Sequence, residues 1–148
     1  MNVNKYGSIS ASYCLALLVI AASCTNLQSL YSEEAYRQAV SLKVESMEML
    51  GNATDAFDTH ENEIRYLQTK LQKAYQYALG RPDNETSTRQ WEILIDPDRN
   101  LLGGFIERWE QQGSLSPTFI NENKRLITDA FDTIIQLESG KIQPSDVE

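Results

Sequence analysis

The feature that most constrains the fold is a repeat of residues, all but one of them apolar, between residues 53 and 78. Successive members are separated alternately by four and three residues, which is the spacing of the a and d positions of a heptad. This spacing aligns them along one side of a helix, and residues 27–79 contain no proline to interrupt it. The run consists of Ala53, Phe57, His60, Ile64, Leu67, Leu71, Ala74 and Ala78. We therefore expect a long helical region with a coiled-coil-like seam.

A discontinuity in the repeat lies at the start of this run. Met49, Ala53 and Phe57 are separated by two successive steps of four, a stutter that shifts the seam around the helix. Gly51 lies at this point, and a glycine inside a helix costs about 1 kcal/mol relative to alanine. We therefore expect the long helical region 27–79 to be two helices. They should span roughly residues 27–50 and 53–79.

Glycine and proline divide the rest of the chain. Residues 80–90 are polar and begin with Gly80 and Pro82, which predicts a loop. Residues 91–112 carry two short apolar patterns, which predict short helical segments that cover one end of the fold. Ser116 is a good N-cap and Pro117 suits the first helical position. The last segments are therefore expected to be a C-terminal helix over 117–139 and a frayed tail over 141–148.

The predicted fold is all-α, in a single domain of residues 24–148. It is an elongated helical hairpin or a bundle of three to four helices, in which the long N-terminal helices pack against the C-terminal one. A seam on an isolated hairpin is only marginally buried, so the pattern also favours a helical partner or a homo-oligomer.

A shorter apolar segment precedes the helical region. Residues 15–22 are apolar, and the only charged residue before them is Lys5. Eight residues are too few to span a bilayer, which takes about 20, but they fit the apolar part of a cleaved signal peptide. The segment ends in Ala21-Ala22-Ser23-Cys24, which resembles the lipobox of bacterial lipoproteins.

The resemblance implies that residues 1–23 are a signal peptide, cleaved after Ser23. It also implies that Cys24 receives diacylglycerol, with acyl chains such as palmitate, and anchors the protein in the membrane. Thr25 stands where such lipoproteins carry aspartate for retention in the inner membrane, which favours the outer membrane, facing the periplasm. Two alternatives stay open: a secretory signal that releases a soluble protein, and an uncleaved apolar tail.

Charge and cysteine count exclude some classes of function. Removing residues 1–23 takes away Lys5 and no acidic residue, so 12 basic and 21 acidic residues leave a net charge of -9. Such a chain is repelled by phosphate backbones, so we expect no nucleic-acid binding. Cys14 and Cys24 are the two cysteines, so the cleaved protein has no intramolecular disulfide.

Two groups of residues resemble metal sites. Asp96, Asp98, Asn100 and Glu107 fall at positions 1, 3, 5 and 12 of a calcium loop, but Leu101 stands where that loop needs glycine. The alternative is a proline turn that caps a helix containing Glu107. The single histidine, His60, is followed by Glu63 one helical turn later and has Asp55, Asp58 and Glu61 nearby. The alternative is a polar seam residue that fixes the register of the helices.

The sequence contains no arrangement typical of nucleophilic catalysis and no phosphate-binding loop. We expect no cofactor and no enzymatic activity. The leading hypothesis is a lipid-anchored protein of the cell envelope that acts as a protein-interaction or accessory module. Its partner would bind the seam of Phe57, His60, Ile64, Leu67 and Leu71. The alternative is a periplasmic protein that binds a metal ion or a small ligand.

Overall fold

The computed structural model describes residues 31–147. The predicted signal peptide, with Ser23 and Cys24, lies outside this part of the chain. The described residues form helices and no strands, which confirms the all-α prediction. The elements are α2 (Glu33–Gly51), α3 (Phe57–Leu79), α4 (Glu85–Ile95), α5 (Leu102–Gln112), α6 (Pro117–Glu138) and the 3₁₀ helix η1 (Pro144–Asp146).

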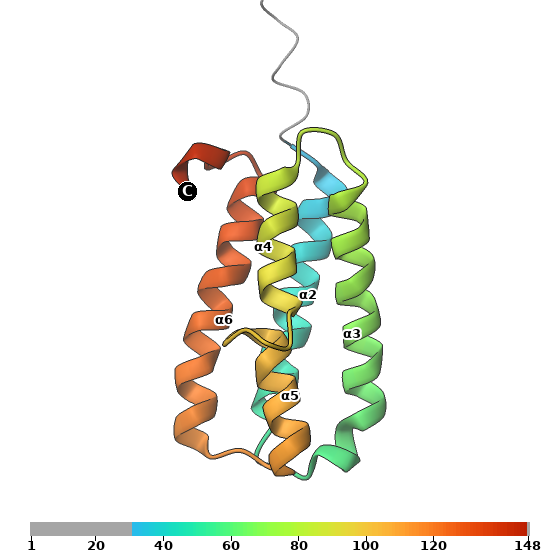
Figure 1. The fold of residues 1–148 in the computed structure, drawn as a ribbon, viewed down its shortest axis with the longest axis vertical. Coiled ribbons are helices and arrows are strands. Elements are labelled where there is room, and N and C mark those ends of the chain that lie inside the picture. Colours follow the sequence, from blue (N-terminus) through green and yellow to red (C-terminus); the bar gives the residue numbers. More distant parts are fainter. Residues whose placement is uncertain (1–30, 148) are drawn as a thin grey trace, which may run out of the picture.

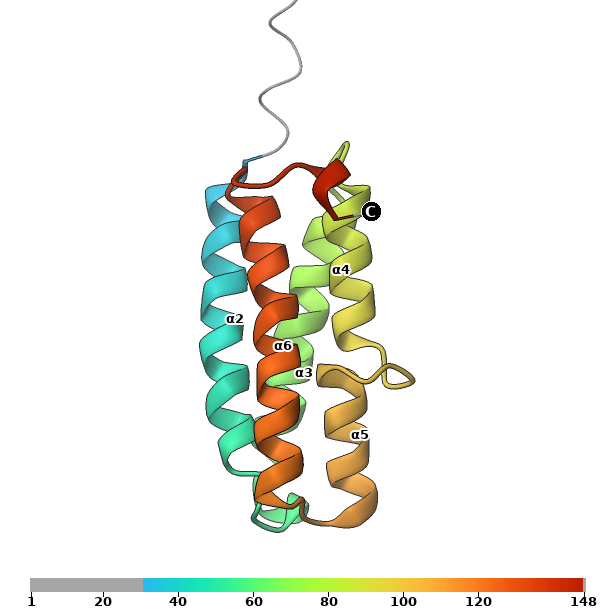
Figure 2. The ribbon, with the colours of Figure 1, turned by 90° about the vertical axis from the view of Figure 1, so that its left-hand side faces the viewer.

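The helices form an elongated bundle of four columns (Figures 1 and 2). Helices α2, α3 and α6 are three of the columns, and α4 and α5 stacked end to end are the fourth. Neighbouring columns run in opposite directions, as in other bundles with short connections. The chain enters the bundle at Ser32, at the same end as the C-terminus (Figure 1); we call this the entry end.

Local sequence explains where two of the helices begin. The Ser32 hydroxyl accepts a hydrogen bond from the amide of Ala35 at 3.2 Å, which caps α2. At α6, the Ser116 hydroxyl accepts a hydrogen bond from the amide of Phe119 at 3.3 Å, and Pro117 opens the helix as predicted. Both helices therefore start where their sequence supplies an N-cap.

Two connections hold each other at the far end of the bundle. The amide of Phe57 donates to the carbonyl oxygen of Gly113, and the amide of Leu115 donates to that of Ala53, each at 2.8 Å. These bonds satisfy backbone groups in the α2–α3 and α5–α6 connections. The break predicted near Gly51 is thus a turn held by tertiary contacts, and α3 needs no side-chain cap.

The apolar stripes of all five α-helices meet in one core. Trp91 packs edge-on against Phe131 with 6.0 Å between ring centroids, and Phe57 packs edge-on against Trp109 at 5.6 Å. Burying a large side chain of this kind stabilises a fold by about 1.5–3 kcal/mol. The core therefore takes residues from every column of the bundle.

The prediction of a loop over residues 80–90 is wrong for its second half. Helix α4 starts at Glu85, and Ser87, Trp91 and Leu94 form its buried face. A serine in an apolar position breaks the sequence pattern. Ser87 is buried because its hydroxyl donates a hydrogen bond to the carboxylate of Glu138, itself buried on α6.

The prediction that residues 91–112 cover one end of the fold is also wrong. Helices α4 and α5 lie along the side of the bundle (Figure 2). A Cβ atom on Gly103 or Gly104 would come closer than 3.0 Å to carbonyl oxygens of Ile95, Asp96 or Arg99. Two glycines thus let α5 start directly below the end of α4 and continue its column.

The C-terminal residues form a short capped helix. Where the sequence predicts a frayed tail, Asp146 accepts a hydrogen bond from the amide of Gln143 at 2.7 Å and caps the short helix η1. Over residues 31–147, no helix combines the length and the apolar character that a membrane span requires.

Candidate functional site

The seam predicted as an interaction surface lies inside the bundle, which corrects that prediction. Phe57, Ile64, Leu67 and Leu71 are at most 7% exposed. Helix α3 packs against α2, α4 and α5 in the same chain, so these helices already cover the seam. The heptad spacing therefore reflects the chain's own core.

Of the calcium-loop residues, Asp96, Asp98 and Asn100 lie on the turn between α4 and α5. Asp98, Asn100 and Glu107 line one shallow pocket, and Asp96 is not among its lining residues. One oxygen of Asp96 accepts a hydrogen bond from the amide of Asp98 at 2.9 Å, and the other lies 3.6 Å from Arg99. Glu107 lies on α5 and accepts a hydrogen bond from Gln111 at 2.8 Å. Within residues 31–147, no three His, Cys, Asp or Glu side chains are grouped to hold a metal ion. The proline turn, the alternative interpretation, describes this segment.

His60 lies at the far end of the bundle, between two carboxylates. Its Nδ1 is 3.3 Å from Glu63 and its Nε2 is 3.4 Å from Asp55, while the ring packs 5.7 Å from the centroid of Trp109. The hydrogen bond with Glu63 is the main cause that raises the pKa of His60, against the opposing effect of burial. Asp58 and Glu61 are not among its hydrogen-bond partners. The arrangement fixes the start of α3 against the preceding turn.

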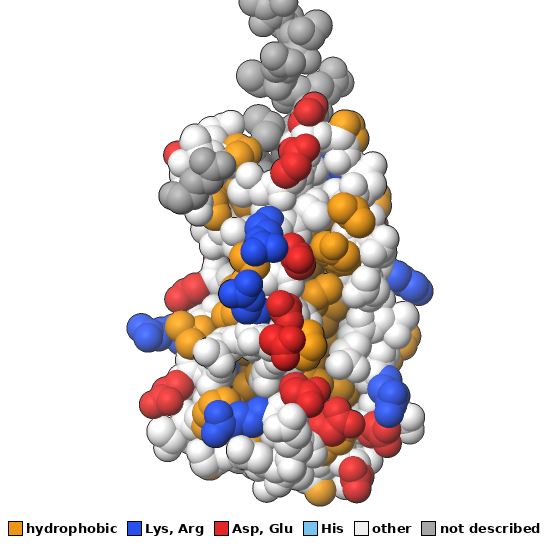
Figure 3. Space-filling model, viewed as in Figure 1, with side chains coloured by type: hydrophobic (Ala, Val, Ile, Leu, Met, Phe, Trp, Pro, Cys, Tyr) orange, Lys and Arg blue, Asp and Glu red, His pale blue; other side chains and the backbone are white. Residues whose placement is uncertain are grey.

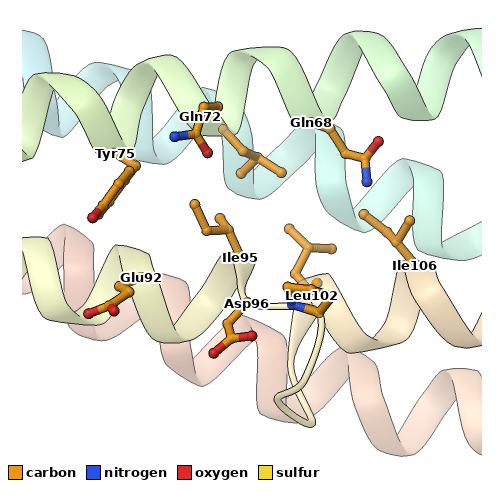
Figure 4. Close-up of a pocket in the computed structure, with 11 residues that line it drawn as sticks. Gln68, Gln72, Tyr75, Glu92, Ile95, Asp96, Leu102 and Ile106 are labelled. Atoms are coloured by element: carbon orange, nitrogen blue, oxygen red, sulfur yellow. The ribbon is translucent and has the colours of Figure 1, made fainter.

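A groove of about 390 Å³ runs between α3 on one side and α4 and α5 on the other (Figure 4). Its floor is aliphatic. Ile95 points from the end of α4 toward α3, and Leu102 and Ile106 do so from α5 (Figure 4). Leu71 completes the floor from α3. The groove crosses the junction where the two short helices meet.

The α3 wall of the groove carries polar side chains at helical spacing. Gln68 and Gln72 lie one turn apart, and Tyr75 follows on the same side of the helix. Among the described residues, none of these three side chains has a hydrogen-bond partner. Two primary amides and a hydroxyl are therefore free to bind a ligand, as polar groups over an apolar floor do in binding sites.

The opposite wall is acidic. Glu92 lines it from α4 and Asp96 from the turn that follows, and no lysine or arginine lines the groove. Arg89 contacts one oxygen of Glu92 at 2.6 Å, and the other oxygen has no hydrogen-bond partner among residues 31–147. The carboxylate of Asp96 points away from α3 (Figure 4). In Figure 3 acidic side chains (red) follow the edge of a strip of apolar side chains (orange), and basic side chains (blue) lie beyond them.

Sequence reasoning missed this groove. Its floor residues belong to apolar patterns that predict core packing, and Gln68, Gln72 and Glu92 look like ordinary solvent-facing residues of a helix. The one available signal was the pair Gly103-Gly104, which indicates that another backbone approaches closely. That backbone is the end of α4, and the junction it makes shapes the groove.

Comparison of the chain with protein families, with curated proteins and with solved structures found no match.

Proposed function

We propose that this chain is a lipid-anchored, non-enzymatic protein of the cell envelope that binds another protein through the groove between α3 and the α4–α5 column. The observation that carries the binding role is the groove itself. It joins an apolar floor to two amides and a hydroxyl that have no partner among the described residues. Those groups are recognition elements that would orient a partner, while the floor beneath them, where Leu71, Leu102 and Ile106 are at most 3% exposed, adds little area to bury.

The anchor is supported by the sequence Ala21-Ala22-Ser23-Cys24 and by its distance from the fold. Eight residue steps from Cys24 to Ser32 reach at most about 28 Å in extended form. An acylated Cys24 would hold the entry end of the bundle within that distance of the membrane. The groove lies between α3 and the α4–α5 column (Figure 4), away from the entry end, where it would stay open to a partner.

The anchor is tested by the intact mass of the protein in membrane and soluble fractions, for the natural chain and for Cys24→Ala. We expect an acylated species that starts at Cys24 in the membrane fraction, and its loss in the variant. A natural chain that starts at Met1, or an unmodified soluble one, contradicts the anchor.

The binding role is tested with a photo-crosslinking amino acid at Gln72, on the wall of the groove. The matched control carries it at Glu122, an exposed residue of α6. Irradiated cells should give a discrete polypeptide adduct from position 72 and none from position 122. Equal labelling from both positions, or none from either, contradicts the role.

A further inference from the structure

We propose that the occupant of the groove is an extended segment of a partner protein, with apolar side chains at alternate positions and a flanking lysine or arginine. This inference rests on the proposed function and names the chemistry of the partner. Three properties of the groove lead to it: the spacing of the glutamines, the aliphatic floor and the charge of the α4 wall.

The glutamine spacing matches an extended backbone. Gln68 and Gln72 are four residues apart on α3, which corresponds to a rise of about 6 Å. Two residues of an extended chain span about 6.7 Å, so alternate peptide groups recur at nearly the same interval. A primary amide has both a donor and an acceptor, and in an extended chain the N–H and C=O of one residue point to the same side, so one glutamine can bind both groups of one residue. A segment lying parallel to α3 can thus use both glutamines.

The floor accounts for the alternation. In an extended chain, successive side chains point to opposite sides. In the partner segment, residues that bind the glutamines through their backbone alternate with residues whose side chains face the floor. The floor consists of Leu71, Ile95, Leu102 and Ile106. The floor is aliphatic, so the inward side chains should be aliphatic too, while the outward ones face solvent.

The α4 wall accounts for the cation. One oxygen of Glu92 contacts Arg89 in an exposed pair, with the two side chains 50% and 56% exposed. Such a pair contributes little, so it does not block a second cation. No basic side chain lines the groove, and acidic side chains lie along its edge, with basic ones beyond them (Figure 3). A lysine or arginine can lay its aliphatic stem over the floor and place its charge beside Glu92.

The test is fluorescence anisotropy with the full-length chain in lipid nanodiscs and labelled nine-residue peptides. In the first peptide, serine and leucine alternate between two terminal arginines. The second has glutamate at both ends, and the third has serine at both ends. Unlabelled 1,6-diaminohexane is the competitor that represents a small cation.

We expect the arginine-ended peptide to bind at least about fivefold more tightly than the glutamate-ended one. The double variant Gln68→Ala, Gln72→Ala should weaken binding of all the peptides about tenfold, and Gln112→Ala, an exposed glutamine outside the groove, should not. Glu92→Gln should weaken only the arginine-ended peptide, and Glu122→Gln should leave it unchanged. All altered residues are exposed or half-buried, and the melting temperature of each variant reports whether it folds.

Several results would overturn the inference. Equal affinity for the arginine-ended and glutamate-ended peptides, or no effect of Glu92→Gln, would show that the partner segment needs no lysine or arginine. Competition by 1,6-diaminohexane at the same concentration as the peptide would indicate that the groove binds a small cation and not a polypeptide. If these results came with a position-72 adduct in cells, the binding role would stand and only the partner chemistry would be wrong. If no peptide binds and no adduct forms in cells, both the binding role of the groove and the proposed partner chemistry are wrong.

Discussion

The indole N–H of Trp109 donates a hydrogen bond to the backbone carbonyl oxygen of Asp55, with 3.0 Å between nitrogen and oxygen. The bond joins α5 to the turn that precedes α3. Trp109 is fully buried, so its indole N–H has no water to bond in place of this acceptor. The tryptophan therefore both fills the core and holds the turn.

Replacing this tryptophan should cost more than replacing the other one. Trp109→Phe removes ring volume and the hydrogen bond, whereas Trp91→Phe removes ring volume at a residue that is 2% exposed and makes no hydrogen bond to a described residue. We expect Trp109→Phe to lower the free energy of unfolding by about 0.5–1.5 kcal/mol more than Trp91→Phe, the net contribution of one hydrogen bond. Urea unfolding followed by circular dichroism measures both. Equal losses would mean that the bond to Asp55 contributes nothing.

A buried carboxylate near the entry end should be the most sensitive charged group. Glu138 is 1% exposed and accepts hydrogen bonds from the Ser87 hydroxyl and the Arg81 guanidinium. Breaking such a buried pair by removing one partner costs about 3–5 kcal/mol, so Glu138→Ala should lower the free energy of unfolding by that amount. The comparison is Glu45→Ala, whose pair with Lys70 is about one-third exposed and should be worth less than about 1 kcal/mol. Similar urea midpoints for the two variants would contradict the prediction.

The helical fold could be predicted because its apolar residues recur at helical spacing. The stutter at Met49 and Gly51 correctly indicated a break, and Ser116 with Pro117 correctly indicated the start of α6. These are local features, and each is read within a few residues of sequence. The same apolar spacing does not say whether a seam binds another molecule or the chain's own helices. For Leu67 and Leu71 the answer is the chain's own core.

The parts that could not be predicted depend on contacts between distant residues. Ser87 looks solvent-facing until Glu138, 51 positions later, is placed beside it. The groove likewise exists only because α4 and α5 stack end to end beside α3. Neither relationship leaves a periodic trace in the sequence, so both needed the structure.

The glycines of the fold should respond to alanine in opposite directions. A Cβ on Gly104 would collide with the carbonyl oxygen of Arg99, so Gly104→Ala must displace backbone and should lower stability by more than about 2 kcal/mol. At Gly51 the nearest atom to a Cβ is the flexible end of Lys124, at 3.4 Å. Gly51→Ala should therefore raise the free energy of unfolding by about 0.4–1 kcal/mol, because alanine restricts the unfolded chain. Thermal unfolding of the two variants checks the signs, and a stabilised Gly104→Ala would refute the close approach at the α4–α5 junction.

The stability of the bundle should depend on pH through His60. The hydrogen bond with Glu63 is the largest effect on the pKa of His60 in the folded state, and it raises that pKa. Burial lowers the pKa, and the hydrogen bond with Asp55 raises it by a smaller amount. When charged, the imidazole donates from both nitrogens, one to each carboxylate. Because the pKa of His60 is higher in the folded than in the unfolded protein, the imidazole contributes its full stabilisation below the unfolded pKa of about 6.5. This stabilisation is lost as the pH rises through the pKa of the folded protein. The difference in free energy of unfolding between the natural chain and His60→Gln should therefore shrink as pH rises over this interval.

Two measurements separate this effect from other titrations. Because His60 is the only histidine, subtracting the pH profile of His60→Gln removes the contributions of all other groups common to both chains. An NMR titration of the imidazole should then show that Glu63→Gln lowers the pKa of His60 more than Asp55→Asn does, because the bond with Glu63 is the larger cause. A difference between the natural chain and His60→Gln that stays flat or grows with pH would mean that the two carboxylates do not hold the charged imidazole in the folded protein.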